Sequence, residues 1–313
     1  MQKIKDSKSA TGRRTLLYIL SPSYSGSTLL TFLLSKHPQI ATIGELKATG
    51  MGDVNEYRCS CSELIRECSF WRSVARRCAG RSIDFSVDAF DTKLSSNNRL
   101  ANRFVDATVR GGLFEFARST ALRLLPGARN ALLESIRRNF EIGKVVCELQ
   151  DKKVFLDSSK TPSRLRHLAD AGLWDIKLIC LRRDGRGVSN SNRKHLNIGI
   201  VPAAERWVRD NREITRTMRL LQDLPRVVVR YEDLCQYPEK TLTTITEALG
   251  LDSLSFTNEA LKDGEHHILG NNMRVNSVSE VRFDESWRTE LSPSDLAEFS
   301  AVAGSVNAGQ GYE

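Results

Sequence analysis

The chain has 313 residues, of which 40% are hydrophobic and 27% are charged. The 46 basic and 38 acidic residues leave a formal net charge of +8. These values are typical of a soluble globular protein, and the positive charge favours anionic partners. The sequence contains no dense basic stripe and no recognisable nucleic-acid-binding module, so we expect no nucleic acid among those partners.

The amino-terminal 35 residues divide into a polar tail and an uncharged stretch. Residues 1–13 are polar and charged, and we predict a flexible tail there. Residues 15–35 carry no charge, which raises the possibility of a membrane span or an export signal. A span would place loop-type residues at mid-bilayer, and the leading apolar block of about six residues is shorter than the ~7–15 of a signal-peptide core. We therefore predict no transmembrane segment and a cytoplasmic location.

The uncharged stretch is better interpreted as a strand, a loop and a helix. Leu16–Leu20 is apolar, Ser21–Thr28 is small and rich in hydroxyl groups, and Leu29–Leu34 has a helix-compatible apolar period. A strand that turns sharply into a helix presents backbone N–H groups and a positive dipole end, which together bind phosphate. In the frame of a Walker A motif Gly26 and Thr28 are in place, but Ser27 stands where the lysine belongs. The missing lysine argues against ordinary ATP-dependent phosphoryl transfer.

Three cysteines lie close together in the next segment, with a fourth ten residues on. Cys59, Cys61, Cys68 and Cys78 could be reduced structural thiols, a metal site or disulfide partners. The spacing is not a standard zinc pattern, no histidine is near in the sequence, and the total of seven cysteines is odd. We favour reduced thiols and assign no metal ligand.

Further strand-like runs indicate an α/β fold. Lys153–Leu156, Ile176–Leu181 and Arg226–Tyr231 are apolar, and each precedes a polar turn and an amphipathic stretch. Such alternation predicts a P-loop-like three-layer fold, with a central and mainly parallel sheet flanked by helices. Ligands of such sheets bind at the carboxyl ends of the strands. We predict a single domain over 14–313 with a helical insertion around 80–145.

A second phosphate-binding element follows one of these strands. Arg183 and Ser191 are eight residues apart on a strand-to-helix segment, so they are able to converge on a single phosphate. Arginine suits this role because its planar guanidinium binds phosphate oxygens bidentately. Cations are disfavoured at a helix start, and a bound anion would relieve that conflict.

Three motifs in order now indicate a family. The loop Ser25-Gly26-Ser27-Thr28, the element from Arg183 to Ser191, and the run Val229–Leu234 together resemble the sulfotransferases that use 3′-phosphoadenosine 5′-phosphosulfate (PAPS). The resemblance spans most of the chain and is strongest to the carbohydrate and tyrosylprotein branch and its bacterial members. It implies transfer of a sulfuryl group to a hydroxyl, or as second choice an amine, with adenosine 3′,5′-bisphosphate (PAP) as the nucleotide product and no metal requirement.

The resemblance also implies roles for individual residues. Ser25, Gly26, Ser27 and Thr28 would hold the 5′-phosphosulfate, and Arg183 and Ser191 the 3′-phosphate. Tyr231 would lie beside the adenine, and Arg274 would contact a phosphate from a loop that closes over the cofactor. Tyr24 departs from the pattern, because most members carry Lys or Arg immediately before the Ser/Thr-Gly of the loop.

Two further residues would carry the reaction. Glu45 lies at the spacing at which tyrosylprotein-type enzymes carry their catalytic carboxylate, and it would accept the proton of the acceptor hydroxyl. His37 is the second candidate base, although its position before a proline at a helix end favours capping or packing. Lys160 matches the lysine of a Lys-x-Pro turn that related enzymes use, and its ammonium would offset charge on the leaving phosphate.

Some questions stay open at this level. A P-loop kinase or NTPase and a non-catalytic PAPS-binding homologue are the alternatives to an active sulfotransferase. We expect a small-molecule or glycan acceptor. The segments that would bind it, around 50–145 and 196–222, carry no signature, so a saccharide, a lipid, a peptide and a small secondary metabolite all stay open. The adjacent His266 and His267 would point apart on an extended segment, so we predict no metal site there. The oligomeric state is not predicted.

Overall fold

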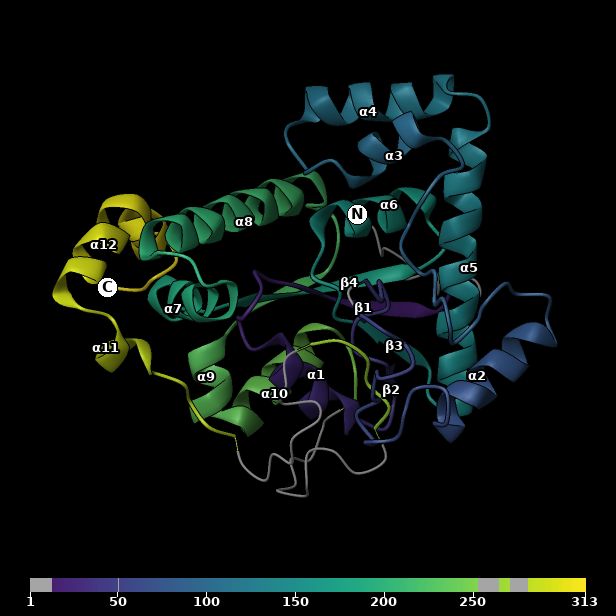
Figure 1. Cartoon of the computed structure of the whole chain (residues 1–313), viewed down its shortest axis with the longest axis horizontal. Helices are drawn as coiled ribbons and strands as arrows, with labels where there is room; N and C mark the ends of the chain where they lie inside the picture. Colours follow the sequence, from purple (N-terminus) through teal and green to yellow (C-terminus); the bar gives the residue numbers. More distant parts are fainter. Residues whose placement is uncertain (1–12, 50, 253–264, 271–280) are drawn as a thin grey trace, which may run out of the picture.

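The computed structural model describes residues 13–49, 51–252, 265–270 and 281–313. Its centre is a sheet of five parallel strands in the order β2-β3-β1-β4-β5. The strands are β1 (Thr15–Leu20), β2 (Ile40–Thr42), β3 (Val154–Asp157), β4 (Asp175–Arg182) and β5 (Arg226–Arg230). Figure 1 shows the sheet between two layers of helices, which confirms the predicted α/β class.

Alternating side chains of β1 supply both faces of the sheet, because successive residues of a strand point to opposite sides. Leu16, Tyr18 and Leu20 pack into the larger core, with side chains from α2, α5 and α6. Leu17 and Ile19 pack into a second core on the other face, with side chains from α1 and α10. A strand buried on both faces reads as a continuous apolar run, and the sequence prediction relied on that feature.

The helices fill the connections between the strands. They are α1 (Ser27–Ser35), α2 (Ser69–Ala79), α3 (Arg99–Asp106), α4 (Gly112–Leu124), α5 (Ala128–Leu149), α6 (Pro162–Ala171), α7 (Gly185–Leu196), α8 (Ile200–Leu220), α9 (Tyr231–Gln236), α10 (Pro238–Ala248), α11 (Trp287–Glu290) and α12 (Pro293–Ala308). None of these helices is both long enough and apolar enough to cross a membrane.

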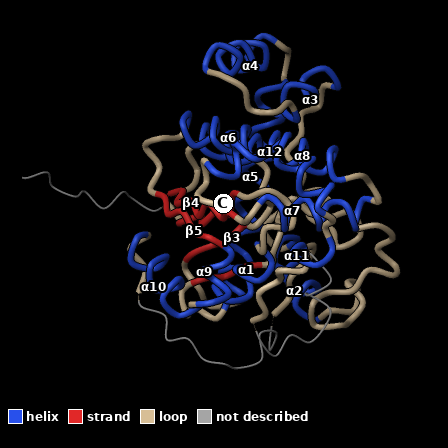
Figure 2. Tube along the Cα trace, turned by 90° about the vertical axis from the view of Figure 1, so that its left-hand side faces the viewer, coloured by secondary structure: helices blue, strands red, loops and turns tan. Residues whose placement is uncertain are grey.

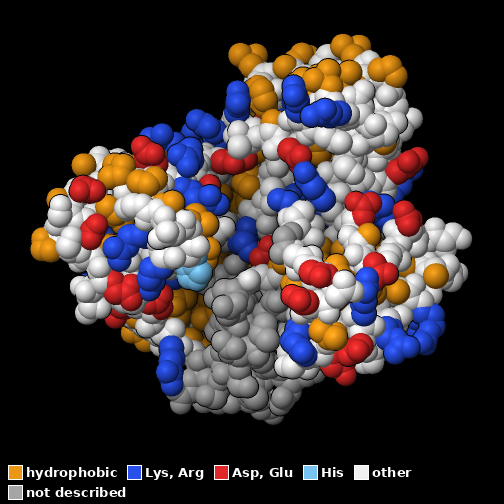
Figure 3. All heavy atoms as spheres, in the orientation of Figure 1, with side chains coloured by type: hydrophobic (Ala, Val, Ile, Leu, Met, Phe, Trp, Pro, Cys, Tyr) orange, Lys and Arg blue, Asp and Glu red, His pale blue; other side chains and the backbone are white. Residues whose placement is uncertain are grey.

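The long segment between β2 and β3 forms the helices α2 to α5, in the region where a helical insertion is predicted. Within it α5 packs against β2 and β3, whereas α3 and α4 project from the body of the molecule in the turned view of Figure 2. Apolar side chains gather on α4 in Figure 3, and Leu113, Phe116 and Leu124 are among the most exposed large hydrophobic residues. The division of the chain into one domain with an insertion stays a prediction.

The predicted strands agree with the observed ones to within a residue or two, but β2 was not predicted. It has three residues, Ile40–Thr42, and among the strands that the structure describes it pairs with β3 alone. A run of three residues is too short to show the alternation of apolar and polar residues by which a strand is predicted. Its parallel pairing with β3 nevertheless decides where the loop after it, which contains Glu45, meets the rest of the molecule.

Candidate active site

The predicted site residues lie where the parallel strands end. The loop Tyr24–Thr28 follows β1, Glu45 follows β2, Lys160 follows β3, and Arg183 and Tyr231 directly follow β4 and β5. Because all five strands are parallel, their carboxyl ends share one edge of the sheet. This edge is where ligands bind in open α/β sheets.

The loop between β1 and α1 has the conformation of a phosphate cradle. Tyr24 and Gly26 both have positive φ angles, of 61° and 88°. Ser27 begins α1, and no side chain caps the start of that helix. The hydroxyls of Ser21 and Ser25 are buried and have no hydrogen-bond partner among the described residues. Buried polar groups are normally paired, so these hydroxyls and the helix start are suited to hold an anion.

Gly26, Tyr231 and Arg183 are stacked on one another. A Cβ on Gly26 would lie 2.3 Å from Cδ2 of Tyr231, so only glycine permits the ring to pack on the loop. The guanidinium of Arg183 lies over the same ring, 4.3 Å from its centroid, in a cation–π contact. Nη1 of Arg183 also donates a hydrogen bond of 2.9 Å to the carbonyl of Tyr24. Three residues predicted to bind the nucleotide therefore meet at the loop.

Asp284 pairs with this arginine, and it was not predicted. Nη2 of Arg183 donates to Oδ2 of Asp284 at 2.8 Å, and the hydroxyl of Tyr231 accepts a hydrogen bond from the Asp284 amide at 3.2 Å. Partial burial raises the pKa of Asp284, but hydrogen bonds from Arg183 and Ser286 outweigh that effect and lower its pKa to about 2. An acidic residue in a segment without a motif gave no signal in the sequence.

The Tyr24 side chain does not replace the missing cation. Its ring stacks on His195 of α7, with centroids 4.7 Å apart. Ser191 is buried on the same helix, one turn before His195, and its carbonyl lies 2.8 Å from Nδ1 of His195. Arg274, the remaining predicted phosphate contact, lies outside the described residues.

Glu45 and Lys160 form an ion pair in which Nζ of Lys160 donates to Oε1 of Glu45. Both side chains are more than four-fifths buried, at 18% and 16% exposure. Lys160 has a φ of 62°, a left-handed conformation that is uncommon for a residue other than glycine. His37 is fully buried instead, and its ring nitrogens face the amide of Gln39 and the carbonyl of Asp252, as a packing or capping role requires.

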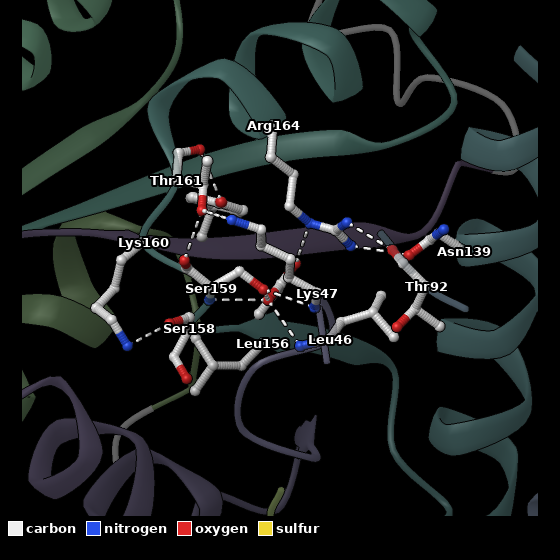
Figure 4. A network of polar contacts seen from close by, with 12 residues as sticks. Leu46, Lys47, Thr92, Asn139, Leu156, Ser158, Ser159, Lys160, Thr161 and Arg164 are labelled. Carbon is white, nitrogen blue, oxygen red and sulfur yellow. Dashed lines mark hydrogen bonds and ion pairs between the residues drawn. The ribbon is translucent and has the colours of Figure 1, made fainter. Parts of the chain in front are cut away.

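A buried carboxylate joins the two segments that carry this ion pair. Oδ1 of Asp157 accepts hydrogen bonds from the amides of Leu46 and Ser159, at 3.2 and 2.9 Å. Its Oδ2 pairs with Nε of Arg164 at 3.2 Å, and both side chains are almost completely buried. Arg164 in turn donates to Asn139 and to the carbonyl of Thr92, as Figure 4 shows.

This network holds the loop after β2 and the turn after β3 in one arrangement. Asp157 was expected at the start of a turn but was not predicted as a site residue, although a carboxylate directly after a buried strand is a recognisable signal. Lys47 was also missed. It lies two residues after Glu45, and its Nζ donates to Oγ1 of Thr161 at 3.3 Å. The pKa of its ammonium is lowered, mainly by burial and to a smaller extent by repulsion from the positive charge of Arg164.

The fourth residue beside Cys59, Cys61 and Cys68 is a histidine and not the cysteine considered from the sequence. Cys78 was considered as the fourth ligand of a metal, but it is buried in the larger core. Instead Cys59, Cys61 and Cys68 meet His266, which is distant in sequence. The expectation that His266 and His267 point apart is met, since the ring of His267 stacks on Phe32.

The family model of the sulfotransferase family matches residues 17–255, which is most of the chain. The protein belongs to the sulfotransferase family. It is therefore a sulfotransferase enzyme, and this membership disfavours the kinase and NTPase alternative. A search of the curated proteins gave no match.

Three solved structures that are similar to this chain are a sulfotransferase and two sulfotransferase domains. The sulfotransferase domain from the curacin biosynthetic pathway is 18% identical, with a TM-score of 0.49 over 96% of this chain and 99% of that one. The sulfotransferase domain of the Synechococcus PCC 7002 olefin synthase is 19% identical, with a TM-score of 0.48 over 93% and 95%. A sulfotransferase from Alicyclobacillus acidocaldarius is 14% identical, with a TM-score of 0.39 over 94% and 97%.

Proposed function

We propose that this sulfotransferase uses PAPS as its donor and transfers the sulfuryl group to a hydroxyl acceptor. The observation that carries the proposal is the pairing of Glu45 with Lys160 at the sheet edge that also holds the phosphate-type loop. A base and a cation are the two groups that sulfuryl transfer to a hydroxyl needs, and here they come from two separate strand ends.

The residues present fit a bisphosphorylated nucleotide. The unpartnered hydroxyl of Ser25 and the start of α1 would hold the 5′-phosphosulfate, together with Gly26, Ser27 and Thr28. Arg183 and Ser191 would hold the 3′-phosphate, and Tyr231 would lie beside the adenine. The 3′-phosphate would compete with Asp284 for the guanidinium of Arg183.

The chemistry of the site follows from the ion pair. When bound, PAPS supplies the sulfuryl group, which forms a new S–O bond to the acceptor as its bond to the phosphate oxygen breaks. Glu45 accepts the proton of the acceptor hydroxyl, which is a poor nucleophile without a base. Lys160 orients that carboxylate and offsets charge on the departing phosphate, in the role that a loop cation at Tyr24 would otherwise fill.

The acceptor would be a small molecule or a glycan, with an amine as second choice to a hydroxyl. The cytoplasmic location stays a prediction. A sulfotransferase that acts on such acceptors needs no metal for the chemistry described, because the charge on the phosphate is met by Lys160 and by backbone amides of the loop.

Thermal unfolding with added nucleotides tests the donor. We expect PAP to raise the melting temperature at concentrations well above its Kd, and ATP with Mg²⁺ to leave it unchanged. Stabilisation by ATP alone would contradict the proposal. Binding of PAP without release of PAP from PAPS in a broad panel of alcohols, sugars and amines would support the non-catalytic alternative instead.

A further inference from the structure

Four potential metal ligands from distant parts of the chain converge at one point. One sulfur each of Cys59, Cys61 and Cys68 and one ring nitrogen of His266 all lie within 4.8 Å of one another. Cys59 and Cys68 are buried, and Cys61 and His266 are half-buried. Among the residues that the structure describes, this is the one group of three or more Cys, His, Asp or Glu with such geometry.

Three of the six separations between the ligand atoms are close to those of a tetrahedral metal site. Sγ of Cys61 lies 3.7 Å from Sγ of Cys68, and Nδ1 of His266 lies 3.3 Å from Cys68 and 3.8 Å from Cys59. Tetrahedral Zn²⁺, with bonds of about 2.3 Å to sulfur and about 2.0 Å to nitrogen, keeps its ligand atoms roughly 3.5–3.8 Å apart. The sulfurs of Cys61 and Cys68 are far beyond the ~2.05 Å of a disulfide bond.

The backbone around the cluster is organised as a ligand-presenting turn. Arg58 and Leu64 form an isolated antiparallel bridge, and the amide of Ser62 donates to the carbonyl of Cys59 at 2.9 Å. This tight turn brings Cys59 and Cys61 to one side. The ring of His266 is held parallel to that of Phe70, with centroids 4.7 Å apart and an interplanar angle of 1°, so its Nδ1 edge faces the sulfurs.

We propose that Cys59, Cys61, Cys68 and His266 bind one Zn²⁺ in a closed structural site. Thiolate and imidazole ligands select zinc over hard cations such as Mg²⁺ or Ca²⁺. Four protein ligands leave no open coordination position, which is the arrangement of structural rather than catalytic zinc.

The site would join a segment late in the chain to the loop after β2. Ser60 already binds this segment, since its hydroxyl donates to the Glu265 carbonyl and accepts from the His267 amide, both at 2.8 Å. Two residues after His266, Ile268 donates to the carbonyl of Ile43 and accepts from the amide of Glu45. Zinc would therefore fix the backbone that carries Glu45. The catalytic consequence of this rests on the proposed function, but zinc binding itself does not.

Metal content tests the proposal without any measurement of activity. The full chain is purified without chelators, under inert gas, and any affinity tag is removed. We expect about one zinc per chain by elemental mass spectrometry. Cys61→Ser and His266→Asn are expected to lower that content at least tenfold. Cys235→Ser is the matched control, because Cys235 is also a half-buried free cysteine and lies outside the cluster, and it is expected to retain the metal.

A second measurement keeps the test decisive where a variant fails to fold. Wild-type protein is stripped of metal with a chelator and then titrated with Co²⁺. We expect the intense visible absorption of tetrahedral cobalt and a thiolate charge-transfer band, both reversed by Zn²⁺. Folded wild-type protein without bound metal and without a cobalt spectrum would overturn the proposal, as would an equal loss of zinc in Cys235→Ser. A Cys61–Cys68 disulfide in protein that is purified under inert gas, before any chelator is added, would overturn it too.

Discussion

The ammonium of Lys160 donates a hydrogen bond to the carboxylate of Glu45, although the two residues are 115 positions apart in the chain. The contact exists because β2 and β3 are adjacent and parallel, so the loop after one meets the turn after the other. Asp157 secures both segments through the Leu46 and Ser159 amides. The geometry gives each member of the pair a separate and testable role.

The Glu45→Gln variant is expected to lose transfer activity while it still binds the nucleotide. The amide is of similar size but takes no proton, and loss of a general base costs roughly 10²–10⁴-fold in rate. PAP release from PAPS is measured with a panel of hydroxyl acceptors, and PAP affinity is measured by calorimetry.

Glu141→Gln is the matched control for that variant. Glu141 is also a half-buried glutamate paired with a lysine, Lys144, at 2.8 Å, but it lies on α5. Full activity in Glu45→Gln, or an equal loss in Glu141→Gln, would remove Glu45 from the role of base.

The Lys160→Ala variant is expected to lose rate more than cofactor affinity. A cation that stabilises the departing phosphate acts mainly in the transition state, and removal of one such group costs roughly 10²–10³-fold in kcat. Lys160→Arg retains the charge and is expected to recover much of the loss. If both variants keep wild-type kcat, Lys160 is a turn residue without a catalytic role.

The Asp284→Asn variant is expected to bind PAP several-fold more tightly than wild-type protein. Asp284 occupies the guanidinium of Arg183 in a 2.8 Å ion pair, and the asparagine removes a competing negative charge. Since the pKa of Asp284 is lowered to about 2, its competition persists unchanged from pH 5 to pH 9. Calorimetric titration measures the affinity, and Glu285→Gln, which removes an exposed partner of Arg288, is the control. Weaker binding in Asp284→Asn would show that the aspartate positions Arg183 instead.

The Gly26→Ala variant is expected to lose PAP binding and to destabilise the fold. Its Cβ would lie 2.3 Å from Tyr231, and its φ of 88° is unfavourable for any residue with a side chain. Gly172→Ala is the control, because Gly172 also has a positive φ, of 63°, but a Cβ there meets no atom within 4 Å. Urea unfolding and PAP titration of both variants separate backbone strain from collision with the ring. Equal behaviour of the two variants would contradict this stacking.

Protein stability is expected to fall as the pH drops from about 6.5 to about 4, because of His167. The pKa of His167 is lowered from 6.5 to about 4, mainly by burial and to a smaller extent by repulsion from Arg166. Between these values the unfolded chain binds the proton and the folded protein does not, so acid favours unfolding. At about 1.4 kcal/mol per pKa unit the loss amounts to about 3 kcal/mol.

Urea unfolding at several pH values measures this dependence. The His167→Gln variant retains a group able to donate to the Val105 carbonyl, which lies 3.1 Å from Nε2 of His167, but it does not titrate. We expect it to have a flatter pH profile, whereas His195→Gln, at an exposed position, keeps the wild-type slope. A wild-type slope in His167→Gln would assign the acid sensitivity to other groups.

The sequence by itself determined the features that local chemistry encodes. Mainly apolar runs predicted β1, β3, β4 and β5, and the run is continuous in β1, which is buried on both faces of the sheet. Small hydroxyl residues around Gly26 predicted the loop, and the order of motifs predicted the sulfotransferase family. Each run and each single motif lies within a few consecutive residues, and their order is read directly from the chain.

Only the tertiary structure decided which distant groups meet. The three residues of β2 have no readable period, yet their pairing with β3 brings Glu45 to Lys160. Asp284 pairs with Arg183, from which it is 101 positions away in the sequence, and His266 contacts Cys68, which is 198 positions away. Such contacts depend on packing of the whole chain, so no local pattern of residues predicts them. For that reason the sequence indicated the reaction, whereas the partners of the proposed catalytic and metal-binding groups became visible only in the fold.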